Sequence, residues 1–111
     1  MVPPMSTVID RVLAALNARD LEAFVACYDP NATIEDGNGR VLAHGHMEIR
    51  NRYGPMCETH PALHVEPLGR WTVGSFVVQE ERVTGRTTEP EHHIAVYQLE
   101  NELIVRERLL R

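Results

Sequence analysis

The chain has 111 residues, of which 43% are hydrophobic and 24% are charged. This length and balance are typical of one globular domain with a single core. Its 16 acidic residues outnumber its 11 basic ones, which gives a net charge of −5. The acidic excess argues against nucleic acid as a partner and against docking on an acidic membrane surface, because both need a basic patch.

The composition also bears on the compartment. No stretch approaches the roughly 20 apolar residues that a spanning helix needs. Residues 1–6 have neither the positive charge nor the apolar run of a secretory signal. The two cysteines, Cys27 and Cys57, are too few for a disulfide framework. We therefore expect reduced thiols and a cytoplasmic protein.

The first quarter of the chain predicts two helices. Apolar residues recur with helical period over 8–16, and a short break follows at 17–20. Asp20 is the predicted cap of a second helix. The apolar stripe of that helix is formed by Leu21, Phe24, Val25 and Tyr28. Pro30 should end it, because proline cannot continue a helix and restricts the residue before it.

The next segment predicts a short hairpin and a third helix. Residues 32–36 are expected to form a strand, and Gly37-Asn38-Gly39 is a tight-turn signal. Residues 40–43 are expected to return as a second strand. The third helix should begin at Gly45, with an interruption or a kink at Gly54-Pro55.

The second half changes to strands. Four runs are rich in β-forming residues, at 63–68, 71–84, 91–100 and 102–110, with breaks at 69–70, 85–90 and 100–101. Because the longest run exceeds ten residues, the sheet must be curved or bulged. Helices followed by strands indicate an α+β fold, with three helices packed on one face of a strongly curved antiparallel sheet. Such a cone has an interior that can hold a small molecule.

This order of elements resembles the nuclear transport factor 2-like superfamily. The first half is similar, in register over about residues 8–53, to bacterial ketosteroid isomerase and the SnoaL-like proteins. The matching residues are Ala14-Ala15-Leu16-Asn17-Ala18, Asp20-Leu21, Ala32-Thr33-Ile34-Glu35-Asp36, Gly39, Gly45, Ile49-Arg50 and Tyr53. The second half resembles uncharacterised members through residues 80–85, 92–97 and 104–106. The resemblance implies one domain over 1–111 and a fold that hosts both enzymes and non-enzymes.

The resemblance also implies roles for individual positions. Asp36 matches the general base of ketosteroid isomerase, and Tyr53 matches the tyrosine that supports its oxyanion hole. The two direct oxyanion donors match Val12 and, to within one residue, Ala95, and neither side chain can donate a hydrogen bond. A lost donor typically costs about 10²–10³ in rate. The resemblance therefore implies a proton-transfer site rather than authentic steroid isomerisation.

Asp36 is also a candidate catalytic residue on physical grounds. A carboxylate at the mouth of an apolar cone is partly desolvated, and desolvation raises the pKa of an acid toward neutrality. The alternative is an ordinary turn residue, because the run Glu35-Asp36-Gly37-Asn38-Gly39 is also typical of a solvated hairpin.

Glu80 and Glu81 lie within an otherwise apolar run, 76–83. Adjacent strand residues face opposite sides, so one of the two carboxylates must face the core side. Glu81 shares the parity of the valines in this run, and we predict that it points inward. The alternative is a salt bridge across the sheet to Arg82, Arg106 or Arg108.

His92 and His93 must also split between the two faces. If Ala95 occupies the pocket position that the resemblance implies, His93 and Tyr97 share its parity and line the cavity. A histidine there can act as an acid, a base or a hydrogen-bond donor near neutral pH. The alternative is a pair of solvated histidines at a sheet edge or dimer face.

Further residues complete the predicted substrate-binding lining. Val12 and Leu16 come from the first helix, and Cys57 comes from the third. Trp71 and the methionines are predicted to be core or cavity residues: Met5, Met47 and Met56. No metal is expected, because the histidine spacings match no ligand motif, and no cofactor is expected, because no phosphate-binding glycine pattern occurs.

Two functions from different classes remain. One is binding of a small apolar molecule with a carbonyl group, with Asp36 as general base in an isomerisation, cyclisation, dehydration or epoxide opening. His93, Tyr97 or Tyr53 would then stabilise the oxyanion. The other is a non-catalytic module for ligand or protein binding. We expect a homodimer in either case, paired through an apolar outer sheet face that includes Val78, Ile94 and Val96.

Overall fold

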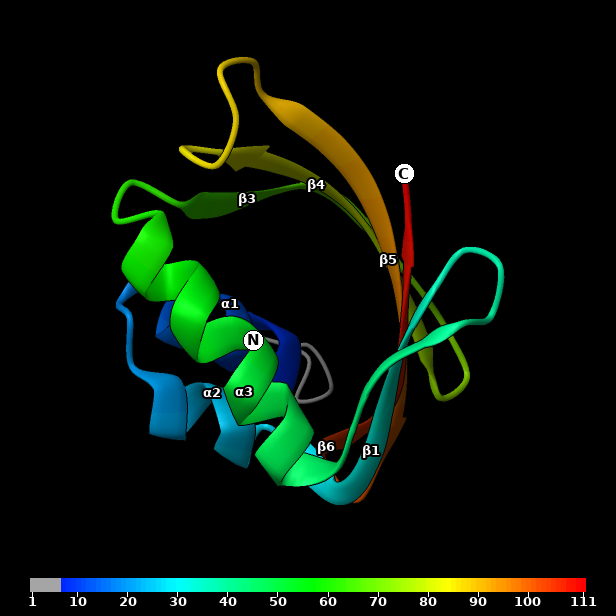
Figure 1. Cartoon of the computed structure of the whole chain (residues 1–111). Coiled ribbons are helices and arrows are strands. Elements are labelled where there is room, and N and C mark those ends of the chain that lie inside the picture. The colour runs from blue at the N-terminus through cyan, green and yellow to red at the C-terminus, as the bar shows by residue number, and fades with distance from the viewer. Residues whose placement is uncertain (1–6) are drawn as a thin grey trace.

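The computed structural model describes residues 7–111, which form three helices and six strands (Figure 1). In chain order the elements are α1 (Thr7–Asn17), α2 (Leu21–Ala26), β1 (Tyr28–Asp36), β2 (Val41–His44), α3 (Gly45–Thr59), β3 (His64–Val73), β4 (Phe76–Thr84), β5 (Glu91–Glu100) and β6 (Leu103–Leu110). Met5 lies outside the described residues. Within the described part of the chain, none of the helices has the length and apolar character needed to cross a membrane.

The strands form one sheet in the order β2-β1-β6-β5-β4-β3. The sheet curls around the helices without closing, so β2 and β3 remain its edges (Figure 1). The predicted α+β fold with helices on one face of a curved sheet is confirmed. One pair of strands departs from the expected antiparallel arrangement. β6 is the last strand of the antiparallel meander β3–β6, and it pairs with β1 in parallel.

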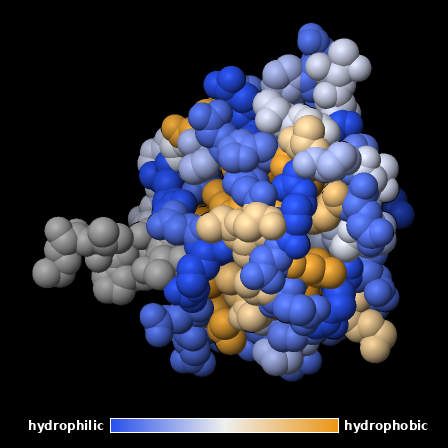
Figure 2. All heavy atoms as spheres, turned by 90° about the vertical axis from the view of Figure 1, so that its left-hand side faces the viewer, coloured by the Kyte–Doolittle hydropathy of each residue, from blue (hydrophilic) through white to orange (hydrophobic). Residues whose placement is uncertain are grey.

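The core lies between the concave face of the sheet and the helices. On α1, side chains with the spacing i, i+3, i+4 and i+7 are buried: Ile9, Val12, Leu13 and Leu16. Burying one such aliphatic side chain stabilises the fold by about 1.5–3 kcal/mol. Seen from the left-hand side of Figure 1, the surface is mostly hydrophilic around a central group of apolar side chains (Figure 2).

The second helix is shorter than predicted. Asp20 caps α2 as expected, because its Oδ1 accepts the backbone N–H of Ala23 at 3.1 Å. The helix ends at Ala26, however, and Tyr28 already begins β1, so Pro30 lies in a strand. Proline is tolerated there because the register between β1 and β6 is interrupted after Tyr28, where the ladder needs no N–H from residue 30.

The third helix contains Pro55 but continues to Thr59, so of the two predicted alternatives the interruption is absent and the kink stays a prediction. Proline removes one backbone donor, which costs helix stability. The cost is offset by packing on both sides of it. Ile49 and Tyr53 before the proline are buried, and Met56 after it packs against the core.

The break predicted at Gly69-Arg70 is also absent, because β3 runs through it to Val73. The chain instead turns at Gly74-Ser75, between the paired residues Val73 and Phe76. Gly74 has a positive φ of 59°, a conformation that glycine adopts at little cost.

Leu68 is an extra residue in β3 that forms a bulge. Pro67 pairs with Glu81 and Gly69 pairs with Glu80, so Leu68 has no partner on β4. The bulge reverses the alternation of side chains along the strand. Val65 and Pro67 before it share a face with Glu81, whereas Trp71, at the same odd parity beyond it, faces the other side of the sheet.

Candidate functional site

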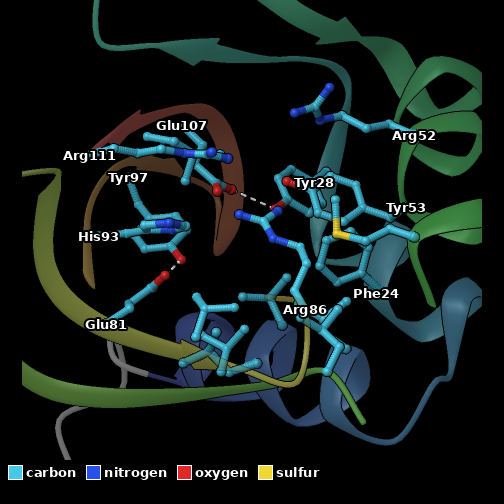
Figure 3. A pocket seen from close by; sticks show the side chains of 18 residues that line it. Phe24, Tyr28, Arg52, Tyr53, Glu81, Arg86, His93, Tyr97, Glu107 and Arg111 are labelled. Carbon is cyan, nitrogen blue, oxygen red and sulfur yellow. Dashed lines mark hydrogen bonds between the residues drawn. The ribbon is translucent and has the colours of Figure 1, made fainter. Parts of the chain in front are cut away.

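A small cavity lies between the concave face of the sheet and the helices (Figure 3). Its free volume is about 60 Å³, which is room for a few water molecules and far below the roughly 300–1,000 Å³ of pockets for drug-sized ligands. Most of its wall is apolar and consists of Val12, Leu13, Leu16, Phe24, Met56, Leu63, Val65, Val83 and Leu109. A few polar groups interrupt this wall, which is the usual composition of a small-molecule site.

Glu107 enters the cavity from β6 and is buried. The Tyr28 hydroxyl donates a hydrogen bond to its Oε1 at 2.5 Å. Burial, reinforced by the negative charge of Glu81, raises the pKa of Glu107 to about 8, and the Tyr28 hydrogen bond and the charge of Arg52 oppose the rise. Glu107 is therefore mostly protonated at neutral pH, and its own O–H can donate a hydrogen bond.

Glu81 faces the same cavity from β4. The Tyr97 hydroxyl and the Gln79 amide both donate to its Oε2 at 2.8 Å. Arg70 holds Gln79 in turn, because its Nε donates to Gln79 Oε1 at 2.8 Å. Burial raises the pKa of Glu81, while the two hydrogen bonds and the charge of Arg70 oppose the rise. Both donors use Oε2, so Oε1 has no hydrogen bond from the described residues.

His93 lies on β5 next to Glu81 in the ladder and is only 7% exposed. Its Nε2 is buried and has no hydrogen-bond partner among the described residues, because the Glu91 carboxylate lies 3.6 Å away. Burial lowers the pKa of His93, which favours the neutral ring. A buried ring nitrogen without a partner is costly unless a bound molecule supplies one.

Three tyrosines add hydroxyl groups to the cavity: Tyr28, Tyr53 and Tyr97. Burial raises the pKa of all three, so each keeps its proton at neutral pH. The Phe24 ring packs between two of them, with centroid distances of 5.3 Å to Tyr28 and 4.7 Å to Tyr53. These contacts fix the rings on the helix side of the cavity.

Three arginines also line the cavity: Arg52 on α3, Arg86 in the β4–β5 loop and Arg111 after β6. Arg86 is paired, because its Nε and a terminal nitrogen donate to the Glu91 carboxylate at 2.8 and 2.7 Å. Arg52 and Arg111 also line an open groove just outside the cavity. The guanidinium groups lie on the side of Glu107 and Tyr53 (Figure 3).

The histidines on and near α3 make local contacts instead of forming a metal site. His46 Nε2 lies 2.7 Å from the backbone oxygen of Tyr28, and His44 Nδ1 lies 2.9 Å from Thr33 Oγ1. Across residues 7–111, no three His, Cys, Asp or Glu side chains are grouped closely enough to hold a metal ion.

The cavity brings together seven of the residues that the sequence predicted as site, core or cavity residues: Val12, Leu16, Tyr53, Met56, Glu81, His93 and Tyr97. The inward orientation predicted for Glu81 and His93 is confirmed, because both side chains line the cavity. What these side chains do there stays a prediction.

Asp36 lies outside the cavity, in the open groove that shares Arg52 and Arg111 with it. Its Oδ1 accepts the backbone N–H groups of Asn38 and Arg40 at 2.9 and 3.0 Å, the pattern of an Asx turn. The carboxylate thus organises its own hairpin turn at the rim. Its assignment as a general base stays a prediction.

Two predicted core or cavity residues are on the surface. Trp71 is 58% exposed, because the bulge at Leu68 turns it to the outer face of the sheet, and Met47 is 73% exposed on α3. Ala95 is completely buried yet does not line the cavity, and neither does Cys57, which packs at the edge of the core. Met56 does line it, as predicted.

The sequence reasoning missed Glu107 and its partner Tyr28. On β6, Ile104 pairs with Leu99 and Arg106 pairs with Gln98, so Val105 is an extra residue. A plain alternation that starts at the buried Ile104 therefore places Glu107 on the wrong face. The sequence did contain a signal for Glu107, because it is an acid between Arg106 and Arg108 in an otherwise apolar strand. Tyr28 was missed because the sequence placed it on the apolar face of the second helix, whereas it is the first residue of β1.

Comparison with known proteins agrees with this architecture. Residues 9–107 match the family model of the SnoaL-like domain. An uncharacterised cystatin-fold protein from Novosphingobium aromaticivorans has 24% identity, 100% coverage of both chains and a TM-score of 0.89. A Sinorhizobium meliloti protein assigned as a polyketide cyclase has 19% identity over 97% of this chain and 99% of its own, with a TM-score of 0.83. A Kribbella flavida protein assigned as a ketosteroid isomerase has 13% identity over 96% of this chain and 76% of its own, with a TM-score of 0.81. At these identities the likeness to solved structures shows the fold alone.

Proposed function

Because this chain belongs to the SnoaL-like domain family and carries two acids inside its cavity, we propose that it binds a small carbonyl compound and moves a proton within it. The observation that carries this proposal is the pair Glu81 and Glu107. Both side chains are buried against the cavity, and neither forms an ion pair with an arginine among residues 7–111.

Burying two acids near each other has a cost that packing alone does not explain. A buried carboxyl group without a cation partner must give up its charge or destabilise the fold. An apolar residue of similar volume would fill the same space at a lower cost. Acids whose pKa values are shifted by burial are instead common where a protein transfers protons.

The two acids are suited to different roles. Protonated Glu107 can donate a hydrogen bond to the carbonyl oxygen of the bound molecule. Glu81 is held by two donors on Oε2, so its Oε1 can accept a proton from the carbon next to the carbonyl. The electron pair of the broken C–H bond then moves into an enol-like system, and the oxygen gains negative charge beside Glu107. Glu81 returns the proton to the same or another carbon, which closes an isomerisation or exchange cycle.

The size of the cavity limits the reacting part of the molecule. A free volume of about 60 Å³ holds a few non-hydrogen atoms. A steroid ring system therefore does not fit within it in this conformation. The reacting end is a short carbonyl fragment, and any longer part extends into the outer groove.

Hydrogen exchange provides a test that needs no knowledge of the natural substrate. Levulinamide, a short uncharged ketone, is incubated with the protein in deuterated water, and loss of its α-hydrogen signals is followed by NMR. We expect exchange above the rate without protein. Glu81→Gln should slow it by about 10²–10⁴-fold through loss of the base. Glu107→Gln should slow it by about 10²–10³-fold through loss of the acidic donor.

The matched control is Glu80→Gln, one residue away on the opposite face of β4, where the carboxylate pairs with His92 at 3.2 Å. It should exchange like the wild type. Asp36→Asn decides between the two candidate bases. Loss of exchange in Asp36→Asn, with full exchange in Glu81→Gln, would assign the base to Asp36. Saturable binding of levulinamide with no exchange would contradict an enzyme and favour the second candidate function, a binding protein.

A further inference from the structure

Two arginines at the mouth of the cavity have no acidic partner in the described chain. Arg52 and Arg111 form no ion pair among residues 7–111, whereas Arg86 beside them is tied to Glu91. The Nε of Arg52 is buried and lacks any hydrogen-bond partner within these residues. Leaving a buried guanidinium nitrogen without an acceptor costs stability, so this position points to a group that arrives from outside.

Both arginines line the cavity as well as the groove that leads out of it. A molecule whose carbonyl reaches Glu107 and whose other end enters the groove therefore lies in a space that both arginines line. Figure 3 shows Arg111 beside Glu107, and Arg52 apart from it above Tyr53. The chain has a net charge of −5, yet this mouth carries two arginine side chains that form no ion pair within residues 7–111. The local field therefore attracts anions although the protein as a whole repels them.

The charge balance of the groove indicates the charge of the ligand. Asp36 is the acidic residue among those that line the groove. Counted over side chains, the groove carries two guanidinium groups and one carboxylate, a net charge of one positive unit that suits a monoanion better than a dianion. A guanidinium fork binds a carboxylate through two parallel hydrogen bonds.

We propose that the ligand is a short oxo acid, with its carbonyl group in the cavity and its carboxylate held by Arg52 and Arg111 at the mouth. This proposal rests on the proposed function, because it takes the carbonyl site as given. Only a few atoms fit inside the cavity. The carboxylate is therefore separated from the carbonyl by a short carbon chain.

The test compares two probes of the same skeleton, levulinate and the uncharged levulinamide. Their dissociation constants are measured by NMR titration at low ionic strength. We expect levulinate to bind about tenfold more tightly or better, and this preference should shrink as salt is added. Arg52→Gln should bring the ratio of the two dissociation constants to near one. Arg111→Gln should reduce it in part.

Arg50→Gln is the matched control, because Arg50 lies on the same helix but is tied to Glu22 by hydrogen bonds of 2.8 and 2.9 Å. It should retain the wild-type ratio.

Equal affinity for both probes in the wild-type protein would overturn the oxo-acid proposal. The proposed function would then still stand if levulinamide exchanged in a Glu81-dependent manner. A preference that survives Arg52→Gln and Arg111→Gln also overturns the proposal. Binding of neither probe counts against both proposals.

Discussion

The two faces of the sheet each bury one glutamate on or beside β6, and the protein treats the two in opposite ways. Glu35 on the outer face is 6% exposed, and Glu107 on the inner face is 4% exposed. Glu35 accepts four hydrogen bonds from Arg106 and Arg108 at 2.8–3.1 Å. The hydrogen bonds from these arginines, of which that from Arg106 has the largest effect, hold the pKa of Glu35 below its usual value. Burial instead raises the pKa of Glu107.

Burial by itself therefore does not decide whether an acid is structural or reactive. The difference lies in what faces the carboxyl group. Glu35 is charged and fully paired, so it joins β1 to β6 and offers nothing to a ligand. Glu107 receives one tyrosine hydrogen bond and faces the cavity. The outer acid stabilises the sheet, and the inner acid is kept at a cost in stability.

The largest expected effect is the pH dependence that Glu107 imposes on stability. Its pKa is about 8 in the folded chain against 4.5 for a free group, so the unfolded chain loses this proton first as pH rises. Stability from this group is fully present below about pH 4.5 and is lost by about pH 8. Glu107→Gln keeps an acceptor for Tyr28 and removes the titration. Its unfolding free energy should exceed that of the wild type by a few kcal/mol at pH 8, measured by urea denaturation.

The quantity that tests this is the difference in unfolding free energy between the wild type and Glu107→Gln, measured at each pH. The advantage of Glu107→Gln should grow steadily from acidic to mildly alkaline conditions. Parallel curves for wild type and variant would mean that Glu107 titrates like a solvated acid, and the contrast between the faces would fail.

The second effect concerns what covers the outer face. We propose that two copies pair through it, as expected from the sequence, because large apolar side chains are exposed across β3, β4 and β5: Trp71, Val73, Phe76 and Ile94. Ile94→Asp should weaken this association about 100-fold, since burying an unpaired charge costs a few kcal/mol. Light scattering after size exclusion measures the mass. Met47→Asp, an exposed apolar site on α3, is the control, and a monomeric wild type would refute the pairing.

A smaller effect is expected from the paired acid. Glu35→Gln removes a carboxylate whose arginine partners are half-exposed, so we expect a loss of about 1 kcal/mol at neutral pH. Because the pKa of Glu35 is lowered in the folded chain, its contribution is present above 4.5 and is lost as pH falls through the folded value. The difference between variant and wild type should therefore vanish in strong acid. A difference that persists there would indicate a packing effect.

The smallest effect is a shift in a single titration. Tyr28→Phe removes the hydrogen bond that favours ionised Glu107, so the pKa of Glu107 should rise above about 8. NMR of the labelled carboxyl carbon measures it directly. Tyr97→Phe is the counterpart, because Tyr97 donates to Glu81 and should mainly move the pKa of that residue upward. No change in either titration would show that the hydroxyl groups do not tune these acids.

The sequence predicted side-chain orientation where strand pairing is regular. The ladder between β4 and β5 has no register shift, and the inward positions of Glu81, His93 and Tyr97 followed from simple alternation. The order of helices and strands along the chain was also predictable from apolar periodicity and turn residues, whereas the parallel pairing of β1 with β6 was not. Boundaries failed where tertiary pairing overrode local signals, as at Tyr28, which joined a strand instead of a helix.

Orientation could not be predicted where a strand carries an extra residue. Leu68 in β3 and Val105 in β6 each reverse the alternation beyond them, which exposed Trp71 and buried Glu107. Whether a strand bulges depends on how its two neighbours fit, and that information lies in distant segments. The orientation of the cavity residues on β4 and β5 was thus predicted, whereas that of Glu107 on β6 was not, and the predicted base Asp36 lies outside the cavity.

The bulge at Leu68 has a consequence for how this hairpin can evolve. Deleting that single residue would leave Gly69 opposite Glu80 and Trp71 opposite Val78, so Trp71 would keep its outward face and Arg70 its contact with Gln79. Inserting one residue between Gly69 and Arg70 would instead reverse the alternation beyond it, turn Trp71 toward the interior and take Arg70 away from Gln79. The hydrogen-bonded support of Glu81 and the space beside it would then change together. Gain of one codon outside the cavity is therefore a route to a new ligand preference, with every residue of the wall left as it was.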